Sequence, residues 1–289
     1  MREAWRSGSV AQSVGGLVRP GSLDGLPPAV RSSGVMFAVG AEAYDRYMGR
    51  YSRDLARGLI AFAAIEPGMR ALDIGCGPGG LTAVLAERLG PASVAAADPS
   101  EQLLAACAER LPGVDARAAP AECLPWPGAT FDAVVSQLVL NFLPDAGAGV
   151  REMRRVTKPG GVIAACTWDY AEGMQMLRVF WDAALELDPT APDEGRTMRY
   201  CSGTELRDLW TRHGFAEVVT EPIEVEVTYA GFDDWWGPFA GGVGPGGAHY
   251  TSLARAPREA LRTACHRRLG SPQGAFTLGA RAFAVRGRV

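Results

Sequence analysis

The sequence predicts an α/β fold built on a doubly wound parallel sheet. Three observations support this prediction. Short apolar strands alternate with helices of about ten residues, a glycine-rich turn follows the first strand, and polar residues stand where strands end. Alternating strands and helices indicate βαβ units, whose right-handed crossovers bring the carboxyl ends of the strands to one edge of the sheet. Ligands bind at that edge in such folds.

Five apolar segments in the first part of the chain predict strands, at 69–74, 93–98, 114–118, 130–137 and 160–168. Helices are expected between them, at 79–89, 100–110 and 149–157. The pattern then becomes less regular. Two further helices are expected at 174–187 and 204–213, an edge strand or strand pair at 216–229, and a last strand at 281–289.

Composition excludes several classes of protein. The chain has 289 residues, is 47% hydrophobic and carries a formal net charge of −3. No segment approaches the ~20 apolar residues of a membrane span, and the slight acidity disfavours a general nucleic-acid binder. The six cysteines form no metal-binding or disulfide pattern, so we expect no metal and a cytoplasmic location. The length suits one large domain or one domain with a cap.

The amino-terminal residues differ from the rest. Residues 1–35 are rich in Gly, Ser, Pro and Arg and predict a disordered arm, so the folded domain is expected at 36–289. Met36 as an alternative translation start and a flexible native arm both stay open. Residues 41–65 show a helical pattern that places Tyr44, Tyr47 and Tyr51 on one face. This face is either a packing surface or part of a helix lying across a ligand pocket.

The stretch LDIGCGPGG carries the main functional signal. Gly75, Gly77 and Gly80 fit the G-x-G-x-x-G spacing of a dinucleotide site. Asp73, however, places a negative charge just before the loop, where it would crowd a pyrophosphate. The amides of the helix that follows favour a negative group. A ligand with an ammonium and a carboxylate, such as an amino acid, meets both requirements.

Asp98 extends this interpretation. It follows the loop by about 20 residues, a usual distance for an acid that accepts hydrogen bonds from ribose hydroxyls. An amino-acid end joined to a ribose describes S-adenosylmethionine. The sequence therefore favours this cofactor over a dinucleotide, which has no need of Asp73.

From about Tyr44 to Trp168 the chain resembles the class I S-adenosylmethionine-dependent methyltransferases, in particular the small-molecule group related to the ubiquinone/menaquinone C-methyltransferases. The resemblance rests on four stretches: LDIGCGPGG, AADPS, AECLPWPGATFDAVVSQLVLNF and REMRRVTKPGG. It implies a Rossmann-like, mostly parallel sheet of seven strands, with the last strand antiparallel beside strand five. It also implies an N-terminal helical lid, a cofactor-binding core at 66–168 and a C-terminal insertion cap at about 230–270.

The resemblance also implies roles for single residues. Asp73, Gly75 and Gly77 would hold the methionine part of the cofactor, and Asp98 its ribose. Ala121 would offer its backbone amide to adenine. Gln137 would line the mouth of the pocket, where the methyl group is transferred.

One departure concerns adenine. Relatives often have Gly-Asp-Ala-Glu where this chain has Ala119, Pro120, Ala121 and Glu122, so a proline replaces the acid that would bind the adenine amino group. Glu122, water or a backbone carbonyl would replace that contact; alternatively, Glu122 caps the loop.

Aromatic residues flank the predicted sheet on both sides in the sequence. The candidates for an acceptor pocket are Tyr44, Trp168, Tyr170 and Trp235. If the lid and the insertion fold over the carboxyl edge, they enclose an apolar chamber for an uncharged or weakly polar small molecule. The alternative is that these residues are ordinary core.

Three functions compete at this stage. The first is methyl transfer from S-adenosylmethionine to a small-molecule acceptor, without nucleic acid or membrane span. The second is a nicotinamide- or flavin-dependent oxidoreductase, and the third is a non-catalytic S-adenosylmethionine-binding protein. The catalytic base, the acceptor and the oligomeric state are not indicated. The candidates for a base are His213, His249, His266, Asp169 and Tyr170; the last two, just past the fifth strand, are better placed, but none is chosen.

Overall fold

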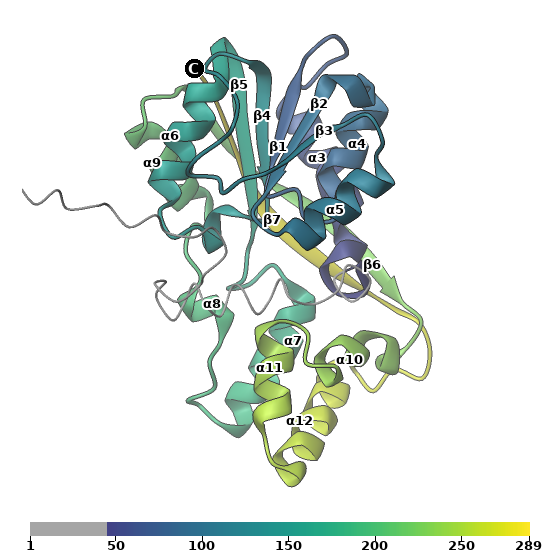
Figure 1. The fold of residues 1–289 in the computed structure, drawn as a ribbon. Helices are drawn as coiled ribbons and strands as arrows, with labels where there is room; N and C mark the ends of the chain where they lie inside the picture. The colour runs from purple at the N-terminus through teal and green to yellow at the C-terminus, as the bar shows by residue number, and fades with distance from the viewer. Residues whose placement is uncertain (1–44) are drawn as a thin grey trace, which may run out of the picture.

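A computed structural model describes residues 45–289. The predictions for residues 1–35, for Met36 and for Tyr44 lie outside the described residues. The chain forms one sheet of seven strands in the order β3-β2-β1-β4-β5-β7-β6, with helices on both faces (Figure 1). The predicted α/β, Rossmann-like fold class is confirmed.

The seven strands differ in length and direction. They are β1 (Ala71–Ile74), β2 (Val94–Asp98), β3 (Asp115–Ala118), β4 (Phe131–Gln137), β5 (Thr157–Trp168), β6 (Ala216–Tyr229) and β7 (Phe276–Arg288). Strands β1 to β5 pair in parallel, whereas β7 pairs antiparallel with both β5 and β6. The segment expected as an edge strand or strand pair is the single edge strand β6.

Two helical layers cover the sheet because side chains alternate between the faces of each strand. Along β1, Ala71 packs in the apolar cluster that contains α3 (Arg50–Phe62) and α4 (Gly80–Leu89), while Leu72 faces α6 (Ala146–Val156) and α9 (Gly203–Arg212). Helix α5 (Glu101–Arg110) packs on β2 and β3. Both faces of β1 and β2 are buried, which explains their continuous apolar sequences.

The N-terminal lid has two different faces. A short π-helix, η1 (Asp45–Gly49), leads into α3. Tyr47 and Tyr51 are buried in the large apolar cluster, as the packing-surface interpretation expects. Ser52, on the other side of the same helix, lines the main cavity, as the pocket interpretation expects.

A helical cap lies beyond the carboxyl ends of the parallel strands, where the long strands β6 and β7 extend past the rest of the sheet (Figure 1). Its helices are α7 (Gln175–Leu187), α10 (Phe232–Ala240), α11 (Gly244–Ser252) and α12 (Arg255–Arg268), with the short α8 (Glu194–Thr197) nearby. The last three large helices correspond to the insertion expected at about 230–270. Among residues 45–289, no helix is long and apolar enough to cross a membrane.

Aromatic rings hold the cap together. Phe180 of α7 stacks on Phe239 of α10 with ring centroids 4.5 Å apart, and Trp235 packs on Phe239 at 5.1 Å. Tyr47 contacts the same ring edge-on at 5.7 Å. The lid and the cap therefore share one apolar core, and the cap is fixed to the domain through aromatic burial.

Candidate functional site

The main cavity lies at the carboxyl edge of the sheet and has a volume of about 540 Å³. It is lined by the loops that follow β1, β2 and β4, by the 120–122 segment and by the lid. All seven predicted cofactor residues line it: Asp73, Gly75, Gly77, Asp98, Ala121, Glu122 and Gln137. The topology thus brings together residues that are far apart in sequence, as expected for a doubly wound sheet.

The glycine loop needs glycine for two different reasons. Gly75 and Gly77 have φ values of 70° and 52°, in the left-handed region that other residues rarely adopt. A Cβ on Gly75 would lie 2.4 Å from Cγ2 of Val139, so close packing also forbids a side chain there. A Cβ on Gly77 would meet nothing within 4 Å, and this residue lines the cavity.

Backbone hydrogen bonds fix the loop over the end of β2. The amides of Gly75 and Cys76 both donate to the carbonyl of Ala97, at 2.8 and 3.0 Å. The amide of Gly77 donates to Oδ2 of Asp98 at 2.9 Å. These bonds hold the glycine loop against the end of β2 without the help of a ligand.

Asp73 is the most unusual acid of the cavity. Its side chain is 1% exposed, and its Oδ2 accepts a hydrogen bond from Thr82 Oγ1 at 2.6 Å. Its Oδ1 is buried and has no hydrogen-bond partner among the described residues. Burial raises the pKa of Asp73 to about 7, against the opposing effect of the Thr82 hydroxyl. A buried carboxylate with an unpaired oxygen favours a ligand that brings a cation or a donor.

Asp98 is held differently, because both of its oxygens are oriented by the backbone. Oδ2 accepts from Gly77, and Oδ1 accepts from the amide of Ser100 at 2.8 Å. Burial raises the pKa of Asp98, while these two hydrogen bonds oppose the shift. A carboxylate has about four acceptor positions, so Asp98 keeps capacity for a ligand hydroxyl.

The 120–122 segment also lines the cavity. Ala121 is buried, and Oε1 of Glu122 is buried without a hydrogen-bond partner in the described part of the chain. The amide of Leu124 instead donates to Oε2 of Glu152, at 2.9 Å. That residue on α6 holds the loop, a contact that the sequence analysis missed.

Gln137 joins the end of β4 to the lid. Its Nε2 donates to the backbone carbonyl of Ser52 at 3.1 Å, while its Oε1 has no partner within residues 45–289. The chain then turns sharply at Leu138, which has a φ of 63°. The following segment builds an apolar wall of the cavity, with Leu138, Val139, Phe142, Leu143 and Pro144.

The rim of the cavity contains residues that the sequence analysis did not identify. Arg110, at the end of α5, donates to Oδ2 of Asp45 at 2.9 Å and to the carbonyl of Pro78 at 3.3 Å. It thereby connects α5, the glycine loop and η1. No sequence signal marks this contact, because it depends on where the lid packs.

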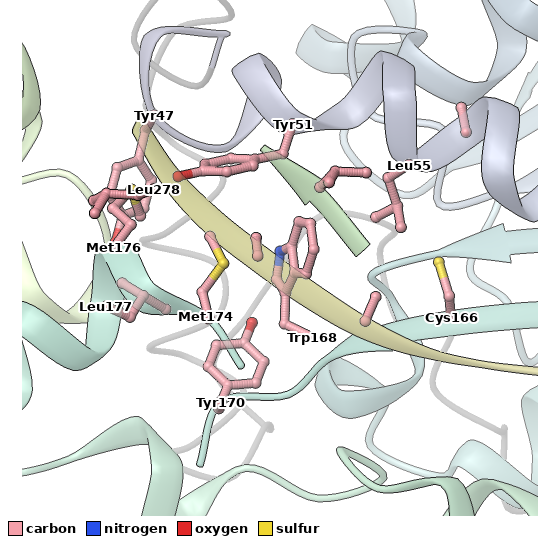
Figure 2. Close-up of a cluster of buried hydrophobic side chains, with 14 of the residues drawn as sticks. Tyr47, Tyr51, Leu55, Cys166, Trp168, Tyr170, Met174, Met176, Leu177 and Leu278 are labelled. Carbon is pink, nitrogen blue, oxygen red and sulfur yellow. The ribbon is translucent and has the colours of Figure 1, made fainter. Parts of the chain in front are cut away.

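The predicted acceptor residues do not line this cavity. Trp168, Tyr170 and Trp235 lie in the apolar core between the sheet, the lid and the cap, each at most 5% exposed. Figure 2 shows Trp168 and Tyr170 in this core. Asp169 is buried and paired with Arg281 at 2.6 Å, and His213 binds the carbonyl of Leu209 at the end of α9. The placement of the three aromatic residues agrees with the second interpretation of the sequence, in which they are ordinary core residues.

The fold and the site together define a Rossmann-like protein whose cavity places buried acids beside a glycine loop at the carboxyl edge of the sheet. Residues 72–165 match the methyltransferase domain family. The chain is 36% identical over 110 residues to trans-aconitate 2-methyltransferase of Azoarcus sp. (strain BH72), covering 38% of this chain and 43% of that protein. It is 35% identical over 139 residues to the ubiquinone/menaquinone biosynthesis C-methyltransferase of Stenotrophomonas maltophilia (strain R551-3), covering 44% and 55%.

Solved structures agree with this relationship. A protein from Anaeromyxobacter dehalogenans, described there as a presumed Type II methyltransferase, aligns with a TM-score of 0.60 and 26% identity, covering 82% of this chain and 96% of that chain. Residues 72–165 are thus similar to methyltransferase domains, and the fold is shared with a solved methyltransferase-like structure. The chain spans about half the length of the two curated relatives, 43% and 55%.

Proposed function

We propose that the protein transfers the methyl group of S-adenosylmethionine to a small-molecule acceptor. The observation that carries this proposal is the buried carboxylate of Asp73, with its unpaired Oδ1, beside a glycine loop at the carboxyl edge of the sheet. A dinucleotide would bring its negative pyrophosphate to this loop, whereas the ammonium of an amino acid pairs with the carboxylate.

The residues of the cavity fit each part of the cofactor. Asp73 would bind the ammonium, and the first amides of α4 would face the carboxylate. Asp98 would accept from the ribose hydroxyls. The amide of Ala121 and the unpaired oxygen of Glu122 supply a donor and an acceptor for adenine. The side chain of Pro120 offers neither, so Glu122 is the polar side chain available there.

The cofactor supplies a methyl group already activated by the sulfonium. The protein's task is then to orient the two reactants and exclude water, which in favourable intramolecular reactions lowers the barrier by ~7–11 kcal/mol. The wall at 138–144 and the lid line the cavity, and Gln137 joins the lid to β4 through the carbonyl of Ser52. No step in this scheme requires a metal ion.

Measurements of ligand binding and of methyl transfer distinguish this proposal from two alternative functions. A nicotinamide or flavin oxidoreductase would bind a dinucleotide, and isothermal titration with NAD, FAD and S-adenosylmethionine distinguishes it. A non-catalytic binding protein would bind S-adenosylmethionine and transfer nothing. A metabolite screen with S-adenosylmethionine carrying a labelled methyl group tests transfer directly: label must appear in a small molecule, and label confined to protein or nucleic acid would contradict the proposed acceptor class.

The cellular setting is part of the same proposal. We place the protein in a reducing cytoplasm, acting without nucleic acid. All six cysteines are free in the structure, and four of them are buried. The relatives named above act, by their names, on trans-aconitate and on quinone precursors, which are small molecules.

A further inference from the structure

The residues assigned to the cofactor leave one side of the main cavity without a role. Gln137 and Leu138, at the end of β4, bound this side together with Ser52 and Arg53 of the lid. The two boundaries touch, because Gln137 donates to the carbonyl of Ser52. A methyl acceptor must come within about 3–3.5 Å of the reacting atom, so it must share this cavity with the cofactor. We call this part of the cavity the acceptor side.

The amide of Gln137 is held in one orientation. Its Nε2 donates to the carbonyl of Ser52 at 3.1 Å, and its Oε1 is buried without a partner in the described part of the chain. The flipped amide would place two oxygens against each other, and an oxygen cannot donate to an oxygen. An unpaired buried acceptor at the wall of a cavity favours a ligand that brings an O–H or N–H group.

The surface beside Gln137 is apolar. Leu138, Val139 and Phe142 line the cavity there. Leu138 has a φ of 63°, a strained value for a residue other than glycine, and such strain is typical of functional sites. Val139 packs so closely on the glycine loop that a Cβ on Gly75 would lie 2.4 Å from its Cγ2. The apolar wall therefore runs from the acceptor side to the loop that would hold the methionine part of the cofactor.

The cations of the cavity already have acidic partners. Within residues 45–289, the cavity is lined by two positively charged side chains, those of Arg53 and Arg110. Arg53 pairs with Glu87 at 2.5 Å, and Arg110 pairs with Asp45 at 2.9 Å. Glu87 itself does not line the cavity. It therefore keeps Arg53 occupied without adding a charge to the cavity wall.

Backbone donors near the cavity are occupied as well. The amides of residues 75–77 and of Gly79 all donate to acceptors of the protein. The first amides of α4 face the carboxylate of the cofactor in the proposed function. Asp73, Asp98 and Glu122 line the cavity and form no salt bridge within the described residues. A carboxylate on a second ligand would meet these acids and no available donor, which makes its burial costly.

We propose that the methyl acceptor is an uncharged, mainly apolar molecule with a hydroxyl group that donates to Oε1 of Gln137, and that the cavity discriminates against carboxylates. Gln137 is a positioning residue, because a neutral amide oxygen orients a donor and does not remove its proton. The pair of Arg53 with Glu87 sets the charge preference. That the bound molecule receives the methyl group rests on the proposed function; the preference for a neutral hydroxyl compound does not.

Three small probes test this preference: benzyl alcohol, benzyl methyl ether and benzoate. The ether keeps the oxygen but has no donor, and benzoate carries a charge. Each is titrated into the full-length protein saturated with S-adenosylhomocysteine, which has no methyl group to transfer, and binding is followed by NMR of the probe signals. We expect the alcohol to bind roughly fivefold more tightly than the ether and roughly tenfold more tightly than benzoate. Equal affinities, tighter binding of benzoate or no saturable binding of the alcohol would overturn the proposal.

Gln137→Leu tests the donor contact, because it removes Oε1 and keeps a similar volume. We expect the ratio of alcohol to ether affinity to fall to within about twofold of unity. Gln273→Leu is the matched control: that glutamine also donates through Nε2 to a backbone carbonyl, at 3.2 Å, but does not line the cavity. Its ratio should equal that of the wild type. If Gln137→Leu weakens both probes alike and keeps the ratio, the role of Gln137 is structural and the assignment is wrong.

Glu87→Gln tests the charge preference, because it leaves Arg53 without its acidic partner. We expect benzoate to bind roughly threefold more tightly than to the wild type, a modest gain because the pair is exposed. Glu66→Gln is the matched control: it also removes an exposed acid from an ion pair, with Arg88 at 2.6 Å, but neither residue lines the cavity. An equal gain in both variants would show a general effect of net charge and contradict the role of Arg53.

The probe comparison in the wild-type protein stands even if a variant fails to fold. Its failure is also distinct from failure of the proposed function, which is tested beforehand by titration of S-adenosylmethionine alone. Binding of S-adenosylmethionine without preference for the alcohol would remove the acceptor class and leave the methyltransferase proposal intact. If the cofactor does not bind, the probes are titrated into the free protein, and the same preference would support the hydroxyl site without the methyltransferase proposal.

Discussion

A buried acid at the start of a glycine loop links the stability of this protein to its ligand. The carboxyl of Asp73 is almost fully buried, and its raised pKa of about 7 means that ionisation is unfavourable in the ligand-free fold. An ammonium beside Oδ1 would reverse this preference. The residue is therefore expected to destabilise the free protein in order to bind a cation, a common conflict at functional sites.

Asp73→Asn tests this conflict in the ligand-free protein. The folded-state pKa lies above the unfolded value, so the stabilising contribution of the protonated acid is present at pH 4 and is lost as pH rises through about 7. The variant lacks this loss. We expect its melting temperature to exceed that of the wild type by an amount that grows from pH 4 to about pH 7 and then levels off. A constant difference in thermal scans over that range would contradict the role of ionisation.

The second acid makes a different prediction. Asp98→Ala is expected to weaken S-adenosylmethionine binding more than tenfold, because ribose hydroxyls lose a charged acceptor worth ~1.5–3 kcal/mol per bond. The change also frees the amides of Gly77 and Ser100, so Asp98→Asn is the better-matched companion and should show an intermediate loss. Titration calorimetry gives both affinities. Unchanged affinity in a folded Asp98→Ala protein would place the ribose elsewhere.

At the level of elements, the sequence predicted the strand ends well. The apolar segments of β1 and β2 are short, buried on both faces and followed by glycine or acid, so local pattern and tertiary position agree. Strand β7 is longer than expected, beginning at Phe276 rather than at 281, because it pairs with β6 along nearly its whole length. That pairing is a long-range property, and the local sequence carries little sign of it.

Contacts between elements were the part of the site that sequence did not predict. Ser52 and Asp45 reach the cavity only because the lid packs beside α4 and the end of β4. Likewise, the aromatic pattern identified Trp168 and Trp235 as notable without indicating which side of the lid they occupy. Periodicity assigns residues to a face, but it does not say what that face meets.

The glycine loop gives a prediction at this scale. Gly75→Ala combines a left-handed φ with a Cβ that would lie 2.4 Å from Val139, so it should destabilise the fold and abolish cofactor binding. Gly68→Ala is the control: its φ is 95°, yet a Cβ there would meet nothing within 4 Å. It should cost only about 1–2 kcal/mol. If thermal unfolding shows equal losses in both variants, the close packing against Val139 is unimportant.

On the scale of the whole molecule, the chain divides its work between a cofactor-binding sheet and an aromatic cap. The two share the lid, whose polar residues face the cavity and whose tyrosines face the cap. The contacts that fix the glycine loop to Ala97 and Asp98 come from the sheet and do not involve the cap. The methyltransferase family model matches residues 72–165, and the cap helices α10, α11 and α12 lie outside that match.

Trp235→Ala tests that division. The side chain is 1% exposed among the cap aromatics, so its loss should cost about 3–5 kcal/mol of stability. Affinity for S-adenosylmethionine should stay within about threefold at a temperature where the variant is folded, while turnover of an identified acceptor falls. Chemical denaturation and calorimetry measure the two effects. A parallel loss of cofactor affinity would show that cap and cofactor site are one unit.

The central claim is that this cavity binds S-adenosylmethionine through Asp73 rather than a dinucleotide through its glycines. Calorimetric titration of the wild-type protein near pH 6.5, in two buffers of different ionisation enthalpy, tests it most directly. We expect S-adenosylmethionine to bind with release of a proton from Asp73, and NAD and FAD to give no binding. Saturable binding of a dinucleotide, or binding of S-adenosylmethionine whose proton release persists in Asp73→Asn, would contradict the claim.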